Sequence, residues 1–350
     1  MSKTSSGRYF EDFMVGEVLR HATPRTITAG DVALYAAVYG SRFAVQSSDE
    51  YARGLGYPRA PVDDLLVFHM VFGKTVPDVS INAVANLGYA EGRFLAPVYP
   101  GDTLASTSEV IGVKENSNGK TGTVYVRTTG RNQRGESVLE YVRWVMVRKG
   151  DEKVPAPKAV VPSLADHVAP EGLGSGVPRL HRKGWDAALA GSPYRWGDYE
   201  VGERIDHIDG MTIEEAEHQL ATRLYQNTAR VHFNAHAEAK GRFGKRIVYG
   251  GHVISLARAL TFNGLGSAFH IAGINGGRHA APCFAGDTVY AWSEVAAKAE
   301  IPGRDDIGLL RVRTFGLKDR DASGFPGVKA DGGHEDGVVL DLDLWLALPR

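Results

Sequence analysis

The chain contains two diverged copies of one segment, and this duplication constrains the fold more than any other feature of the sequence. Four motifs recur in the same order: Val15–Glu17 as Val201–Glu203, Ala96–Thr103 as Ala281–Thr288, Ser108–Val110 as Ser293–Val295, and Thr128 with Gly130 as Thr314 with Gly316. The offset is 185 or 186 positions each time. Solenoid repeats have periods of only about 20–50 residues. Each copy is therefore domain-sized, and we expect two domains of one fold.

Composition narrows the classes of protein to consider. A length of 350 residues suits about two domains. The net charge of −1 argues against a nucleic-acid or membrane-surface partner. No apolar run approaches the roughly 20 residues of a membrane span, and Met1–Arg8 is too polar for a signal peptide. We therefore expect a cytoplasmic protein.

The single cysteine, Cys283, excludes an internal disulfide and suits a reducing compartment. It lies within a repeated motif, at the position that Val98 occupies in the first copy. A buried structural thiol is the expected role, rather than a nucleophile.

Each copy is expected to contain two helices before its strands. Capping-box patterns at Thr28–Asp31 and Thr212–Glu215 predict the start of the first helix in each copy. Apolar, helix-forming stretches at Leu65–Phe72 and Val253–Phe262 predict the second helix.

The later part of each copy reads as β-strands. Alternating, β-branched stretches predict strands at Thr123–Thr128, Val138–Val147, Leu309–Phe315 and Val338–Leu348. Asp341–Leu346 alternates strictly, as expected of an antiparallel strand with one buried face. Helices followed by antiparallel strands predict an α+β fold in which a sheet wraps a helix, present twice and joined into one continuous sheet with pseudo-two-fold symmetry.

The predicted boundaries follow from what the repeat leaves out. We place an N-terminal domain at residues 1–150, a linker at 151–192 and a C-terminal domain at 193–350. Lys149–Pro193 belongs to neither copy, and its proline-rich first half predicts an extended connector. The second copy has an insertion within Lys318–Gly337, which is rich in Gly and Asp and predicts a solvated hairpin loop.

Three positions at which the copies differ indicate where function could reside. In the register of 186, His232, Asn227 and Gly250 of the second copy replace Gln46, Ser41 and Asp64 of the first. A His on a loop can act as acid or base near pH 7, and a Gly before a helix leaves a backbone N–H free to bind an oxyanion. From these residues alone, a solvent-facing His beside a turn is an open alternative.

The stretch Gln226-Asn227-Thr228-Ala229-Arg230-Val231-His232, followed by Ile247 to His252, resembles the MaoC-like (R)-specific enoyl-CoA hydratase family. That family's motif is Gly-Asp-x-Asn-Pro-(Leu/Val/Ile)-His, followed by Pro-Ile-x-His-Gly. The resemblance implies a tandem (double) hotdog fold, with His232 and Gly250 as catalytic residues and Gly251 as a substrate-binding residue.

The chain departs from the family motif at three positions. Asn227 stands where the family has Asp, Ala229 where it has Asn, and Arg230 where it has Pro. An amide can orient a water molecule but cannot accept its proton, so the proton transfer falls to His232 or to a carboxylate elsewhere. The first copy lacks every catalytic element, and the resemblance implies that this non-catalytic hotdog shapes the acyl pocket.

Within that family, the tandem layout, the length and Tyr225–Asn234 resemble the mesaconyl-CoA hydratases, also called β-methylmalyl-CoA dehydratases. This resemblance implies reversible hydration of the 2-enoyl-CoA thioester mesaconyl-CoA, with the Gly250 N–H stabilising an enolate. Because the mesaconyl group bears a free carboxylate, Arg42 or Arg230 is expected to bind it. A hotdog acyl-CoA thioesterase and a non-catalytic acyl-CoA-binding protein are the alternatives.

No cofactor is indicated by the sequence. It has no Cys/His cluster at zinc-site spacing and no P-loop. His232 and His236 have the spacing of a helical ligand pair, but no third ligand is evident, so no metal is expected. The expected partner is an acyl-CoA thioester, and the expected assembly is a homodimer.

Overall fold

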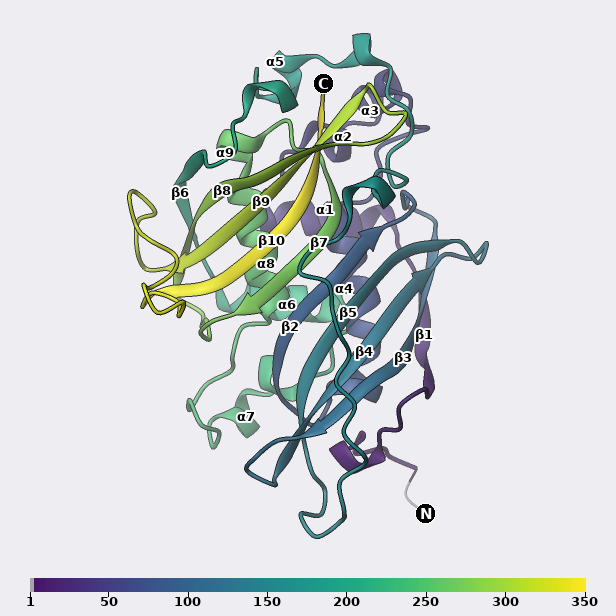
Figure 1. The fold of residues 1–350 in the computed structure, drawn as a ribbon, viewed down its shortest axis with the longest axis vertical. Helices are drawn as coiled ribbons and strands as arrows, with labels where there is room; N and C mark the ends of the chain where they lie inside the picture. The colour runs from purple at the N-terminus through teal and green to yellow at the C-terminus, as the bar shows by residue number, and fades with distance from the viewer. Residues whose placement is uncertain (1–2) are drawn as a thin grey trace.

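The computed structural model describes residues 3–350, which form one ten-stranded antiparallel sheet in the order β1-β3-β4-β5-β2-β7-β10-β9-β8-β6 (Figure 1). The strands are β1 (Val18–Thr26), β2 (Ala83–Phe94), β3 (Thr103–Glu115), β4 (Thr121–Arg131), β5 (Ser137–Arg148), β6 (Arg204–Thr212), β7 (His270–His279), β8 (Thr288–Glu300), β9 (Ile307–Lys318) and β10 (Val338–Pro349). β1–β5 come from the first copy and β6–β10 from the second. The continuous sheet and its pseudo-two-fold arrangement are confirmed.

The two halves join where β2 pairs with β7, the equivalent strand of the other copy. Tyr89 lies opposite Gly277, and Arg93 lies opposite Gly273. Glycines permit the close approach, because a Cβ at Gly92 would stand 2.6 Å from the Ile274 side chain across the junction.

Four main helices pack on one face of the sheet (Figure 1). They are α1 (Ala29–Tyr39), α4 (Asp64–Thr75), α6 (Glu215–Leu224) and α8 (Gly250–Leu260); the shorter ones are α2 (Ala44–Ser47), α3 (Asp49–Leu55), α5 (Ala187–Ala190), α7 (Ala235–Glu238) and α9 (Phe262–Leu265). α4 and α8 are buried along almost their whole length. Each is wrapped by its own half-sheet and lies in the hydrophobic core that the two halves share. Both predicted second helices are confirmed, but α8 begins three residues earlier than expected, at Gly250.

One of the two predicted capping boxes is wrong. Thr28 does cap α1, in a capping box with Asp31. Thr212 instead ends β6, where its hydroxyl lies 2.8 Å from that of Thr288. Its counterpart in the repeat is Thr26, which ends β1 and makes the same contact with Thr103 at 2.7 Å. The acidic residue three positions after Thr212 therefore begins α6 without a capping side chain.

The repeated motifs recur because they make the same contacts in both halves. Gly16 and Gly202 both have positive φ, of 86° and 89°, and each donates a 2.8 Å hydrogen bond, Gly16 to Val110 of β3 and Gly202 to Val295 of β8. Two buried hydrogen-bonded chains also match: His21–Ser108–Thr128 in the first half and His207–Ser293–Thr314 in the second. Agreement between the copies is therefore explained by the shared fold.

The linker crosses the outer face of the sheet, opposite the main helices (Figure 1). Val160 forms an isolated bridge to Val113 of β3. Further along, Val168 accepts a hydrogen bond from the indole of Trp345 at 2.9 Å, and Leu173 and Leu180 are buried against the second half. The connector is therefore packed along its second part rather than free.

The insertion in Lys318–Gly337 covers part of the same outer face. Its Ala322 is buried with Trp292 and Phe315, and the only ladder contact described within it is one bridge between Val328 and His334. Most of this loop is exposed, as expected of a solvated hairpin, although Ala322 also shields two aromatic rings.

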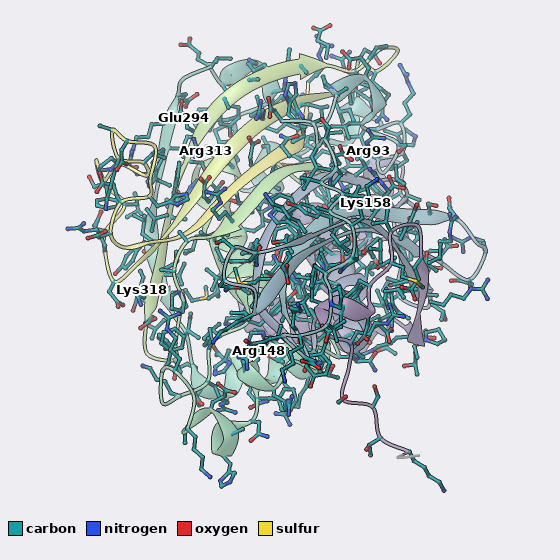
Figure 2. The ribbon with its side chains drawn as sticks, turned by 60° about the horizontal axis from the view of Figure 1, so that its bottom comes forward. Arg93, Arg148, Lys158, Glu294, Arg313 and Lys318 are labelled. Carbon is teal, nitrogen blue, oxygen red and sulfur yellow. The ribbon has the colours of Figure 1, made fainter. Side chains whose placement is uncertain are left out.

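The outer face of the second half carries charged pairs. Asp341 and Asp343 of β10 bind Arg313 and Arg311 of β9, each at 2.7 Å. Figure 2 shows Arg313 beside Glu294 of the neighbouring strand, its partner in the β8–β9 register. This confirms the alternation predicted for Asp341–Leu346. Across residues 3–350, no helix combines the length and apolar character needed to cross a membrane.

Candidate active site

A cavity of about 560 Å³ lies between the two halves of the sheet and is lined by both. The first half contributes Phe72, Val76, Ser80, Ala83, Val84, Ala85, Asn86, Tyr89, Arg143, Val145 and Met146. Asn227, His232 and Gly250 belong to the wall contributed by the second half. The structure therefore brings together the three residues predicted to be catalytic.

His232 is held in one tautomer by the backbone. It ends the short 3-10 helix Arg230–His232, and its Nδ1 lies 2.9 Å from the carbonyl oxygen of Ile247. A carbonyl only accepts, so Nδ1 carries the proton and Nε2 is left with a lone pair. Burial lowers the pKa of His232 to about 4, so the imidazole is neutral near pH 7 and can act as a base.

Asn227 is buried three residues after the end of α6. Its Oδ1 accepts a hydrogen bond of 3.0 Å from the backbone N–H of Ala229. This contact assigns the other side-chain atom as the NH₂ group, which can donate to the oxygen of a water molecule. Such a water would keep its own protons available for transfer.

Gly250 is the first residue of α8, so its N–H has no acceptor within the helix. The helix N-terminus also places partial positive charge here. A Cβ at this position would stand 2.5 Å from Cε1 and Nε2 of His279, closer than real Cβ atoms approach. Glycine is therefore needed because an imidazole occupies the space of a side chain. Gly251 lies outside the cavity lining and is buried, with Tyr249 and His69 occupying the space beside its Cα.

His279 is a cavity residue that the sequence reasoning missed. It ends β7 opposite Leu340, and its Nε2 is buried without a hydrogen-bond partner. Burial, together with nearby His232, lowers its pKa to about 4. Phe94 holds the matching place in the first half, opposite Leu139. The repeat could have revealed His279, since Phe94 and His279 each stand two positions before the same repeated motif and therefore correspond to each other.

Arg143 is the second cavity residue that was missed. Its Nη2 donates to the Thr75 hydroxyl at 2.6 Å and contacts the Ser80 hydroxyl at 3.3 Å, and its guanidinium lies 4.2 Å from the centre of the Phe72 ring. The side chain is fully buried, and Nε and Nη1 have no hydrogen-bond partner. The alternation within Val138–Val147 places Arg143 at an inward-facing position, and this sequence signal was overlooked. Leu344 stands at the matching position of the second copy.

The two arginines expected to bind a carboxylate lie elsewhere. Arg42 is exposed, with its guanidinium 4.5 Å from the centre of the Phe262 ring. Arg230 is exposed at the start of the 3-10 helix that ends at His232. Neither belongs to the cavity lining.

Acidic side chains are missing from the cavity lining within residues 3–350. No residue of this cavity lining can therefore be the carboxylate partner of His232 that the sequence left open. In the same part of the chain, no group of three or more His, Cys, Asp or Glu side chains is arranged to hold a metal ion. Cys283 is buried as expected, and burial raises its pKa to about 12, so its thiol stays protonated.

The matching site in the first half is closed. Its space is about 10 Å³, and its lining includes Gln46, Asp64 and Phe94 at the positions of His232, Gly250 and His279. The Asp64 carboxylate accepts a 2.7 Å hydrogen bond from the N–H of Ile271 and lies 2.9 Å from Nδ1 of His270. These hydrogen bonds satisfy the carboxylate within the protein. The remaining space of about 10 Å³ is too small for an acyl group.

The fold and the cavity define a double-hotdog protein of the MaoC-like dehydratase class. A crystal structure from Chloroflexus aurantiacus, described as a MaoC domain protein dehydratase, superimposes with a TM-score of 0.98 at 62% identity, covering 100% of this chain and 99% of that one. A Mycobacterium tuberculosis protein described as a double hotdog matches with a TM-score of 0.73 at 24% identity, covering 99% of both chains, which supports the fold alone.

Sequence comparisons define the family more closely. The mesaconyl-CoA hydratase family model matches residues 2–159. The β-methylmalyl-CoA dehydratase of Chloroflexus aurantiacus is 63% identical, covering 100% of this chain and 99% of its own. The mesaconyl-CoA hydratase of Cereibacter sphaeroides is 58% identical, covering 99% of this chain and 100% of its own. The chain belongs to the mesaconyl-CoA hydratase family.

Proposed function

We propose that this protein is a hydro-lyase that reversibly hydrates mesaconyl-CoA to β-methylmalyl-CoA. One observation carries the proposal: a neutral, tautomerically fixed His232 and the free N–H at the start of α8 belong to one cavity. The full-length relatives at 63% and 58% identity support this substrate.

The proposed reaction begins with a water molecule held by the Asn227 amide. Nε2 of His232 accepts a proton from the water while its oxygen bonds to the β-carbon of the enoyl thioester. The π electrons move onto the thioester oxygen, which becomes an enolate oxygen. The N–H of Gly250 stabilises that charge, a contact worth about 3–4 kcal/mol in a well-studied oxyanion hole.

The reaction is completed when the enolate collapses and the α-carbon takes a proton. The imidazolium of His232 can return the proton it received, which leaves the site in its starting state. His279, beside Gly250, is a second imidazole at the same end of the cavity. With no acidic side chain in the cavity lining of the described residues, these two imidazoles and the fixed dipoles carry the proposed chemistry.

We assign catalysis to the C-terminal hotdog (193–350) and pocket shaping to the non-catalytic N-terminal hotdog (1–150), joined by the linker (151–192). The closed first-half site and the open second-half cavity support this division. The proposal includes a cytoplasmic homodimer, which light scattering on the purified protein and fractionation of producing cells would check.

Hydration in ¹⁸O-labelled water tests the proposal. The product should be a CoA thioester heavier than the substrate by one labelled water, with the label on the hydroxyl group. A thioesterase would instead place the label in a free carboxylate and release CoA. A non-catalytic acyl-CoA-binding protein would return unlabelled substrate.

A further inference from the structure

Arg143 is a buried cation without an anion. It is fully buried, and within residues 3–350 it makes no ion pair. Transferring an ammonium- or guanidinium-sized ion into a protein interior costs several kcal/mol even after relaxation. The Phe72 ring beneath the guanidinium offsets about 2 kcal/mol of this cost. The position is therefore destabilising as it stands, and burial lowers the pKa of the guanidinium.

A second unpartnered polar group lies on the neighbouring strand. Asn86 of β2 lies opposite Val145 of β5, two residues from Arg143 along that strand. Both amide atoms of Asn86 are buried without a hydrogen-bond partner. Buried polar groups in native proteins are nearly always paired. Arg143 and Asn86 both line the cavity, so N–H donors gather on the first-half side of its wall.

These donors complement one functional group of the proposed substrate. The mesaconyl group carries a free carboxylate at the end of its acyl chain, remote from the thioester. We propose that Arg143, assisted by the Asn86 amide, binds this carboxylate, in place of the exposed Arg42 and Arg230. This inference rests on the proposed function and adds the basis of its selectivity for a dicarboxylic acyl group.

The proposed division of labour crosses the junction between the halves. In this proposal the second half supplies His232 and Gly250 at the reacting double bond. The first half supplies Arg143, whose positive charge binds the carboxylate at the far end of the acyl chain. Leu344, the counterpart of Arg143 in the second copy, carries no charge. Only the cavity that contains His232 therefore has a cation at this position of the strand.

The test compares two substrates on matched variants. Arg143→Met keeps side-chain length and removes the charge. We expect it to lower kcat/KM for mesaconyl-CoA on the order of 10²-fold, as for a buried charged pair that loses one partner. Activity on crotonyl-CoA, which has no carboxylate, should change only a few-fold. Asn86→Ala should act in the same direction with a smaller loss.

Two controls make the result decisive. Arg242→Met removes the other arginine of the cavity lining, which is exposed, and should change both substrates by equal factors. The unliganded Arg143→Met protein should melt no lower than wild type, because the substitution removes an unpaired buried charge whose desolvation costs several kcal/mol. If Arg143→Met is insoluble, Arg143→Lys should show a selective rise in KM for mesaconyl-CoA.

An unchanged ratio of kcat/KM between the two substrates in these variants would overturn the assignment of Arg143 while leaving the proposed function intact. If wild-type protein hydrates neither substrate, the proposed function fails and this inference fails with it.

Discussion

The hydroxyl of Tyr225 donates a hydrogen bond of 2.7 Å to the hydroxyl of Tyr39, its counterpart 186 positions earlier in the chain. A contact between equivalent residues marks the pseudo-two-fold axis. His69 and Ser255, also 186 positions apart, meet in the same way at 3.0 Å. The axis relates two potential sites, of which one is open and one is closed. The differences between those sites motivate the first three predictions.

His232→Ala is expected to lower kcat by about 10²–10⁴, the usual contribution of a general acid or base. The fold should be retained, because the side chain makes one hydrogen bond, to Ile247. His236→Ala is the matched control, since His236 is exposed and outside the cavity lining. Near-wild-type turnover in folded His232→Ala would remove His232 from the mechanism.

Asn227→Ala is expected to lower kcat less than His232→Ala does. The amide is proposed to hold a water by donating to its oxygen, and another water position can partly replace that contact. The double variant checks the assignment through steady-state kinetics. If each single variant is as inactive as the double, the two residues act as one unit, and the water-holding role is wrong.

Gly250→Asp is expected to lose several orders of magnitude in activity, because its charge opposes the enolate. Any side chain here also collides with His279, whose ring atoms lie 2.5 Å from an added Cβ. Gly250→Asn is therefore the control, with the same size and no charge. The Asp variant should be at least about ten-fold less active than the Asn variant. Equal losses would mean that steric displacement explains everything and that the enolate is stabilised elsewhere.

The pH dependence follows from the lowered pKa of His232. Burial favours the neutral imidazole and lowers its pKa to about 4. The base form therefore exists above that pH, and hydration should be lost only as pH falls through it. We expect kcat/KM to be level between about pH 5 and 7 and to decline below, with His279 contributing to the same decline because its pKa is also about 4. An acid limb centred near 6.5 would indicate a solvated imidazole in the working site.

The architecture could be predicted well from the sequence because residues that make the same contacts in both halves recur in both copies. Matches such as Ser108 with Ser293 persist since both halves bury the same hydrogen-bonded chain. The Thr212 capping box failed because a Thr at a strand end and a Thr before a helix share one local pattern. Only the repeat register, which pairs Thr212 with Thr26, distinguishes them.

The site residues that lie close together in the sequence were predictable. Those that are brought to the cavity only by strand pairing were not. Asn227, His232 and Gly250 lie within 24 consecutive residues, so a motif finds them. Arg143 reaches the cavity from the other half of the chain through the β5–β2–β7 arrangement, which no local pattern encodes. Arg230 was expected because it lies in the catalytic segment, and Arg42 because it lies in the equivalent segment of the first copy, yet both side chains are exposed.

The central claim is that the second-half cavity hydrates mesaconyl-CoA. The most direct measurement follows the enoyl-thioester absorbance and free thiol together, in wild-type protein and in His232→Gln, which carries the residue of the closed site. Wild type should lose the absorbance without releasing thiol, and His232→Gln should do neither at a comparable rate. Thiol release in step with the absorbance loss, or equal hydration by both proteins, would contradict the account.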